Sequence, residues 1–182
     1  SHLPLGISGL WVKPVDESFH ARFDAHSRQY RYVILNRQVR PALEAGRVTW
    51  CREALDVNAM NQAAQALRGE HDFTSFRASA CQARHAVREI HDIAVRRRGD
   101  YVTLEVTANA FLYHMVRNIA GTLMEVGTGR AEPGWVGEVL GACDRDCAGI
   151  TAPPDGLYFV RVRYPGRFGL PSRKRAFPFS AP

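Results

Sequence analysis

The chain has 182 residues and a formal net charge of +6, with 46% hydrophobic and 10% aromatic residues. This length and composition indicate a single globular domain, and no stretch is apolar for long enough to span a membrane as a helix. The charge comes from 22 arginines and two lysines against 18 acidic residues. Such a basic balance is compatible with a polyanionic partner such as nucleic acid, although a GC-rich genome would produce the same arginine bias.

Hydrophobic periodicity divides the chain into strands and helices. Apolar residues at every second position predict strands, and apolar residues at steps of three and four predict helices. The first half is predicted to contain strands over residues 7–15 and 29–36, a helix that begins after Asp56 and ends at Gly69, and a loop over residues 71–86. The second half is predicted to contain strands over residues 87–97 and 101–108, helices over residues 109–129 and from Pro133, and a strand over residues 157–164.

These elements predict an α+β domain over residues 1–164, in which helices pack on one face of a mainly antiparallel mixed sheet. Along the strand at residues 29–36, Tyr30 and Ile34 are expected on one face and Val33 on the other. Residues 165–182 are predicted to form an extended basic tail that contains Arg173-Lys174-Arg175.

Arg117 occupies an unusual position on the apolar helix predicted at residues 109–129. It is not clearly opposite the apolar stripe, and two of its neighbours one turn away, Ala120 and Gly121, are small. Small residues allow another segment to approach closely, and a desolvated guanidinium then needs an anionic or planar partner. Taken alone, Arg117 is more simply explained as the solvent-facing edge of an ordinary helix.

The four cysteines do not form a metal site. Cys143 and Cys147 make one C-x3-C pair, with no second pair and no nearby histidine, whereas structural zinc sites need two such pairs. We therefore expect no metal, reduced thiols and a cytoplasmic location.

Several segments, in the right order along the chain, resemble the bacterial tRNA pseudouridine synthases of the TruA type. The segments that carry the resemblance are Phe19-His20-Ala21-Arg22-Phe23 with Ser27-Arg28-Gln29-Tyr30-Arg31-Tyr32, His71-Asp72-Phe73-Thr74-Ser75-Phe76-Arg77, Asn109-Ala110-Phe111 through Ile119, and Gly156-Leu157-Tyr158. Each motif alone is modest evidence, but together and in register they are specific.

The resemblance implies that the chain takes part in converting uridine to pseudouridine in the anticodon stem-loop of tRNA, at tRNA positions 38 to 40. Tyr30 matches the family's tyrosine that stacks on the target uracil and is a candidate to take the proton from its C5 atom. Arg117 matches the arginine that pairs with the catalytic aspartate, and Leu157 matches the apolar residue packed against the base. These three residues are expected to converge on one cleft.

The family's nucleophilic aspartate belongs to a Gly-Arg-Thr-Asp-Ala-Gly motif, and no aspartate of this chain has that setting. The chain is therefore predicted to be the C-terminal half of an enzyme, inactive alone, in which Arg117 has no carboxylate partner. The resemblance implies no metal and no organic cofactor, and a homodimer for the full-length enzyme.

The resemblance also implies contacts with tRNA. Arg22, Arg28 and Arg84 would supply positive charge to RNA phosphates. The complete set of predicted RNA-binding residues is Phe19, His20, Ala21, Arg22, Phe23, Arg28, Ala80, Cys81, Gln82, Ala83 and Arg84. An alternative is that at least one of Phe19 and Phe23 is a core aromatic. For the chain as a whole, the alternative is a non-catalytic α+β module that binds RNA.

Overall fold

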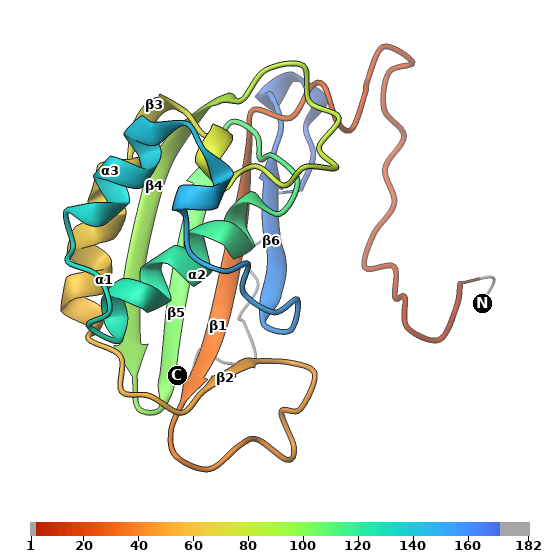
Figure 1. Cartoon of the computed structure of the whole chain (residues 1–182). Helices are drawn as coiled ribbons and strands as arrows, with labels where there is room; N and C mark the ends of the chain where they lie inside the picture. The colour runs from red at the N-terminus through yellow and green to blue at the C-terminus, as the bar shows by residue number, and fades with distance from the viewer. Residues whose placement is uncertain (1–2, 172–182) are drawn as a thin grey trace.

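The computed structural model describes residues 3–171, so the predicted basic run Arg173-Lys174-Arg175 lies outside the described residues. Its centre is a six-stranded sheet with three helices on one face (Figure 1). The strands are β1 (Ser27–Asn36), β2 (Thr49–Cys51), β3 (Gly69–Asp72), β4 (Val87–Arg98), β5 (Tyr101–Ala108) and β6 (Leu157–Arg163). The helices are α1 (Val57–Ala64), α2 (Met115–Gly127) and α3 (Trp135–Ala142). No helix among the described residues is long and apolar enough to cross a membrane.

The strand order is β2-β1-β5-β4-β3, with β6 also pairing with β1. Only the pairing of β1 with β2 is parallel, and the other pairs are antiparallel. The prediction of an α+β fold with a mainly antiparallel mixed sheet is therefore confirmed. Along one side of β1, β6 pairs with residues 27–32 and β2 with residues 34–36, so β1 organises both halves of the sheet.

The two faces of β1 have the residues that its alternation predicted. Tyr32 and Ile34 are buried in the main core beneath the helices, and Tyr30 packs against its edge. Val33 and Leu35 point to the opposite face, where they form a small second cluster with Val48. Helix α1 likewise begins as predicted, because the Asp56 carboxylate accepts from the backbone amides of residues 58 and 59 at 2.9 and 3.0 Å.

The structure corrects the predicted elements at residues 7–15 and 71–86 and adds one short strand. Residues 7–15 form no strand and run away from the sheet as an irregular segment (Figure 1). A strand must satisfy its backbone groups with a neighbour, and no described strand pairs with this segment. The predicted loop at residues 71–86 begins inside β3, and the three-residue β2 was not predicted. Both strands are too short to show a period in the sequence.

Helix α2 begins at Met115, later than predicted, because His114 has a left-handed backbone with φ 59° and ψ 6°. A residue in that conformation cannot continue a right-handed helix. Phe111 and Leu112 therefore lie in the connection between β5 and α2 rather than on the helix. The apolar stripe that follows is buried as expected, through Met115, Ile119 and Leu123.

The small residues of α2 do allow another segment to approach. A Cβ atom at Gly121 would lie 1.8 Å from the carbonyl oxygen of Ile150, so only glycine fits there. The approaching segment is hydrogen-bonded to the helix, because the amide of Ala152 donates to the Arg117 carbonyl at 3.2 Å. The Gly149 amide donates to the Thr122 hydroxyl at 3.1 Å. Residues 149–152 are thereby fixed along α2.

The buried side chain of Asn118 extends this connection on both sides. Its amide nitrogen donates to the Phe76 carbonyl at 2.8 Å, and its amide oxygen accepts from the Thr151 hydroxyl at 2.6 Å. A buried amide with both ends bonded holds its neighbours in one arrangement. Asn118 thus links α2 to the 74–76 turn and to residues 149–152.

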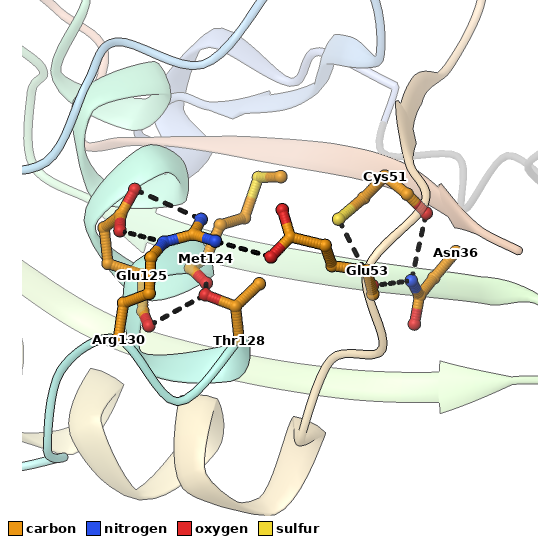
Figure 2. Close-up of polar contacts among 7 residues, drawn as sticks. All are labelled: Asn36, Cys51, Glu53, Met124, Glu125, Thr128 and Arg130. Carbon is orange, nitrogen blue, oxygen red and sulfur yellow. Dashed lines mark hydrogen bonds and ion pairs between the residues drawn. The ribbon is translucent and has the colours of Figure 1, made fainter. Parts of the chain in front are cut away.

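The C-terminal end of α2 is held against β1 and β2 by surface contacts (Figure 2). Arg130 forms ion pairs with Glu125 and Glu53, each at 2.6 Å. The Glu53 carbonyl accepts from the side-chain amide of Asn36 at 2.6 Å. Because these ion pairs are solvent-exposed, each stabilises the fold by less than about 1 kcal/mol, and they position the helix end more than they stabilise it.

Gly121→Ala should lower the free energy of unfolding by about 3 kcal/mol or more, because the new methyl group would collide with a backbone carbonyl that is hydrogen-bonded in place. Gly141→Ala on α3 is the matched control, since a Cβ atom there meets nothing within 4 Å. The control should gain about 0.5 to 1 kcal/mol from the lower backbone entropy of alanine. Urea denaturation measures both changes, and equal midpoints for the two variants would contradict the packing described.

Tyr32 should make stability depend on pH in the alkaline range. Its buried hydroxyl contacts the Thr49 hydroxyl and donates to the Pro153 carbonyl at 2.7 Å, and burial raises its pKa to about 12. The unfolded value is about 10, so the folded protein binds more protons between these two values. The stabilisation is complete below about pH 10 and is lost as the pH rises to about 12, on the order of 3 kcal/mol in all.

Comparing Tyr32→Phe with the unsubstituted protein isolates this effect, because the phenylalanine cannot ionise. Denaturation midpoints measured from pH 9 to 12 should fall more steeply for the unsubstituted protein than for the variant. Parallel pH profiles would show that the Tyr32 hydroxyl ionises as easily in the folded protein as in the unfolded chain.

Candidate active site and nucleic-acid interface

A cleft of about 900 Å³ opens where the N-terminal end of α2 faces strands β1 and β6. Tyr30, Arg117 and Leu157 all line this cleft, although they come from three different elements. The rest of its wall is formed by residues 80–83, by residues 110–116 and by the loop that contains Arg22. The fold therefore places in one cleft the three residues that the family resemblance predicted to converge.

The floor of the cleft is aromatic. The half-buried ring of Tyr30 lies 4.9 Å from the Phe111 ring and 5.2 Å from the Phe159 ring, measured between centroids. Burial raises the pKa of Tyr30, and the nearby Arg28 partly opposes this shift. The hydroxyl is therefore protonated at neutral pH, and no described residue is hydrogen-bonded to it.

Leu157 is the first residue of β6, and its place is fixed by the glycine before it. Gly156 has φ 95°, and a Cβ atom there would lie 2.4 Å from the Val33 carbonyl oxygen. The Gly156 carbonyl accepts from the Val33 amide at 2.8 Å. This close approach seats Leu157 opposite Tyr32 in the register of β1 and β6, where its side chain forms an apolar wall next to the aromatic floor.

Arg117 is held by neutral groups alone. Its Nε donates to the Ala152 carbonyl at 2.8 Å, and its Nη1 lies 3.1 Å from Nε2 of His114. Partial burial, together with the charge of Arg117, lowers the pKa of His114, so the imidazole does not compete with the guanidinium as a cation. No described carboxylate forms an ion pair with Arg117, and its positive charge is left facing the cleft.

Three other arginines line the cleft, Arg22, Arg28 and Arg88, and they differ in their hydrogen bonds and exposure. Arg28 donates through Nη1 to the Asn109 and Ala25 carbonyls at 2.6 and 3.0 Å, and it also bonds to the Arg22 carbonyl. These bonds tie the loop before β1 to the end of β5. Arg22 is exposed on the rim, and Arg88 reaches the cleft with a buried Nε that has no hydrogen-bond partner.

The loop at residues 80–83 is shaped by Arg77, whose Nη2 donates to the Cys81 and Ala83 carbonyls at 2.9 and 2.8 Å. It is also attached to the start of α2, because the Tyr113 amide lies 3.4 Å from the Cys81 sulfur and the Ala78 amide donates to the Tyr113 carbonyl at 3.1 Å. The loop thus presents to the cleft, in a fixed shape, its backbone, the small side chains of Ala80, Cys81 and Ala83, and the amide side chain of Gln82.

The predicted RNA-binding residues divide into two groups. Those that line the cleft are Ala21, Arg22, Arg28, Ala80, Cys81, Gln82 and Ala83. Those outside its lining are Phe19, His20, Phe23 and Arg84. Phe19 packs edge-on against Tyr164 and Phe168, with centroid distances of 5.1 and 4.9 Å, but it is only partly buried and belongs to neither core cluster, so the alternative of a core aromatic is wrong for it. Phe23 is 76% exposed, so it is no core aromatic either, and its ring lies 4.3 Å from the His20 ring between centroids.

Sequence reasoning missed several residues of the cleft, chiefly His114, Tyr113 and Arg88. His114 lies one helical turn before Arg117, a spacing that was visible in the sequence. Its left-handed backbone and its bond to Arg117 were not visible, because neither leaves a pattern in the residues. Arg88 was part of a predicted strand, where one more arginine in a basic chain carried no signal.

The arrangement suits a planar group bound beside an anion. A base could lie on the aromatic floor against Leu157, while a carboxylate or phosphate is attracted to Arg117 and to the arginines of the rim. The cleft lining contains no aspartate or glutamate. Among its described residues, this chain has the cation and the platform but no acidic nucleophile in the cleft.

Comparison with known proteins agrees with this chemistry. Residues 63–165 match the family model described as tRNA pseudouridine synthase. The tRNA pseudouridine synthase A of Nitrosococcus oceani is 55% identical over 166 residues, which cover 91% of this chain and 64% of that protein. The protein of the same name from Thiobacillus denitrificans is 49% identical over 180 residues, 99% of this chain and 69% of that protein.

A third relative of the same name, from Hydrogenovibrio crunogenus, is 55% identical over 171 residues, with 94% of this chain and 65% of that protein covered. The chain thus spans about two thirds of the length of these relatives. The match to the Thiobacillus denitrificans protein, which covers 99% of this chain, extends over the segments that form the sheet, α2 and the cleft. The chain belongs to the tRNA pseudouridine synthase family.

Proposed function

We propose that the protein containing this chain converts uridine to pseudouridine in the anticodon stem-loop of tRNA, at tRNA positions 38 to 40. In this proposal an aspartate outside the chain is the nucleophile, and the chain supplies the base platform, the aspartate-binding arginine and part of the tRNA surface. The observation that carries the proposal is the convergence of Tyr30, Arg117 and Leu157 on a cleft without a carboxylate.

The reaction requires the uracil to be detached, turned and reattached. The bond between N1 and the sugar C1′ breaks, a new bond forms between C5 and C1′, a proton leaves C5, and N1 takes up a proton. A carboxylate nucleophile divides this change into easier steps. While the base is detached, it must be held between apolar and aromatic surfaces, and Tyr30 and Leu157 are suitably placed for that.

Arg117 is suited to orient the missing carboxylate. Two of its five N–H groups are bonded to Ala152 and His114, so three remain for an anion. A guanidinium pairs best with a carboxylate through two parallel hydrogen bonds. A fixed guanidinium would hold the nucleophile in one orientation and keep it ionised.

The neutral Tyr30 hydroxyl limits how it can take part in proton removal from C5. With its pKa raised by burial, the phenolate is scarce at neutral pH. The oxygen can accept a proton only if its own proton passes to water or to the RNA. We propose that the ring stacks on the base and that the hydroxyl relays the C5 proton in this way.

We further propose that tRNA lies across the rim formed by Arg22 and residues 80–83, with Arg84 and Phe23 making contacts outside the cleft. The full-length protein is proposed to be a cytoplasmic homodimer that works without metal or organic cofactor. The lack of an acidic residue in the cleft lining also favours a second candidate, a non-catalytic RNA-binding module. This candidate predicts tRNA binding without turnover by the full-length natural protein.

Arg117→Ala in the full-length natural protein should reduce turnover by about a hundredfold or more, while tRNA affinity changes by less than about threefold, because this arginine orients the nucleophile. Release of tritium from tRNA labelled at C5 of uridine measures turnover, and filter binding measures affinity. Normal tritium release by this variant would overturn the role given to Arg117.

Arg22→Ala and Arg84→Ala serve as contrasting controls for this experiment. Each should weaken tRNA binding. Each should also reduce the slope of the logarithm of the association constant against the logarithm of salt concentration by about one, as expected for a lost phosphate contact. Turnover at saturating tRNA should remain close to normal. If these two variants behaved like Arg117→Ala, the separation between the rim and the reaction centre would be wrong.

Tyr30→Phe should keep tRNA affinity within about threefold, because the stacking face is retained. Tritium release should fall by about a hundredfold, because the variant lacks the hydroxyl that relays the proton. Tyr30→Ala should lose affinity as well. Tritium release by Tyr30→Phe at the normal rate would assign the proton transfer to another group.

A further inference from the structure

We propose that His114 is a positioning residue that fixes the orientation of the Arg117 guanidinium, and that it must be a neutral hydrogen-bond acceptor to do so. This inference rests on the proposed function, because it concerns the arginine that is to hold the nucleophile. The evidence lies in the bond between the two side chains, the backbone of His114 and the groups that fix its ring.

The bond between the side chains determines the tautomer of His114. Nη1 of Arg117 lies 3.1 Å from Nε2 of the imidazole. A guanidinium can only donate hydrogen bonds, so Nε2 must be the acceptor and the ring proton must be on Nδ1. Partial burial and, to a lesser extent, the proximity of Arg117 lower the pKa of His114, which keeps this acceptor available at neutral pH.

Two acceptors hold the guanidinium from different directions. The Ala152 carbonyl accepts from Nε at 2.8 Å, and His114 accepts from Nη1. Residues 149–152 are themselves fixed against α2 at Gly121. With only the Ala152 bond, the guanidinium plane could still turn about its Nε–H···O contact, and the second bond through His114 removes that freedom.

The backbone of His114 supports a role beyond packing. His114 and Cys143 are the two described residues other than glycine with positive φ, at 59° and 49°. A left-handed conformation costs a non-glycine residue about 1 to 2 kcal/mol. Cys143 follows the end of α3, where such residues are common. His114 precedes α2, a position that helix capping does not require to be left-handed.

The imidazole ring is stacked on one neighbouring aromatic ring. Tyr113 stacks on it with a centroid distance of 3.9 Å and an interplanar angle of 24°. Tyr113 is in turn fixed through its backbone to the loop at residues 78–81. Contacts of this kind maintain a strained residue in place. The same loop therefore shapes the rim of the cleft and, through Tyr113, the position of His114.

The test uses the full-length natural protein and the variant His114→Gly, which removes the imidazole and at the same time relieves the left-handed backbone. We expect kcat for tritium release to fall about tenfold or more, KM for tRNA to change by less than about threefold, and the thermal unfolding temperature not to decrease. Cys143→Gly is the matched control. It relieves the other left-handed residue, which does not line the cleft, and should leave kcat unchanged.

Chemical rescue separates positioning from structure. Imidazole added to His114→Gly should restore part of kcat, and the rescue should increase with pH from 6 to 8, as the neutral form of added imidazole becomes abundant. It should have no effect on Cys143→Gly or on Arg117→Ala. A purely structural role for His114 would not respond to imidazole.

The outcomes separate this inference from the proposed function. Loss of activity in both Arg117→Ala and His114→Gly, with imidazole rescue of the second alone, supports both. Loss in Arg117→Ala with normal kcat in His114→Gly overturns the role of His114 and leaves the proposed function standing. A His114→Gly variant that is less stable and is not rescued by imidazole also overturns the role of His114 and leaves the proposed function standing. Normal activity in Arg117→Ala overturns the proposed function itself.

Discussion

The close contact between α2 and residues 149–152 is the constraint on which the cleft depends. Gly121 allows the Ile150 carbonyl to approach the helix backbone where no other residue would fit. That approach brings the Ala152 carbonyl within hydrogen-bond reach of the Arg117 Nε. The chain then continues to Gly156, whose own close approach to Val33 seats Leu157 at the start of β6. The glycine on the helix thus helps to fix the cation of the cleft, and Gly156 fixes its apolar wall.

The cleft carries a positive charge because the groups that hydrogen-bond to Arg117 are neutral. A buried or half-buried cation is normally matched by a carboxylate, because desolvation penalises an unpaired charge. Here the groups bonded to Arg117 are a carbonyl and an imidazole whose lowered pKa keeps it neutral. They satisfy the geometry of the guanidinium without cancelling its charge. The site can therefore attract an anion, which a complete ion pair within the chain would prevent.

Much of this structure could be predicted from the sequence, because apolar residues recur with a regular period in most elements and most turns contain typical turn residues. The hairpin of β4 and β5 and the Asp56 cap were visible in this way. Residues 7–15 were assigned wrongly because a strand depends on a partner, which a local pattern cannot reveal. In the site, the small neighbours of Arg117 alone did not separate it from a surface arginine, and it was the family resemblance that selected it together with Tyr30 and Leu157. His114 was not selected, since a left-handed backbone and a hydrogen bond between side chains have no counterpart in residue spacing.

The irregular segment at residues 7–15 has a practical consequence for handling the protein. It exposes several large apolar side chains, with Leu10 69%, Trp11 52% and Val12 95% accessible to solvent. Exposed apolar stretches of this kind adhere to one another in concentrated solution. Light scattering or gel filtration of the isolated chain would then report adhesion through this segment. Dilution series and mild detergents are needed before any measured particle mass is interpreted as a specific assembly.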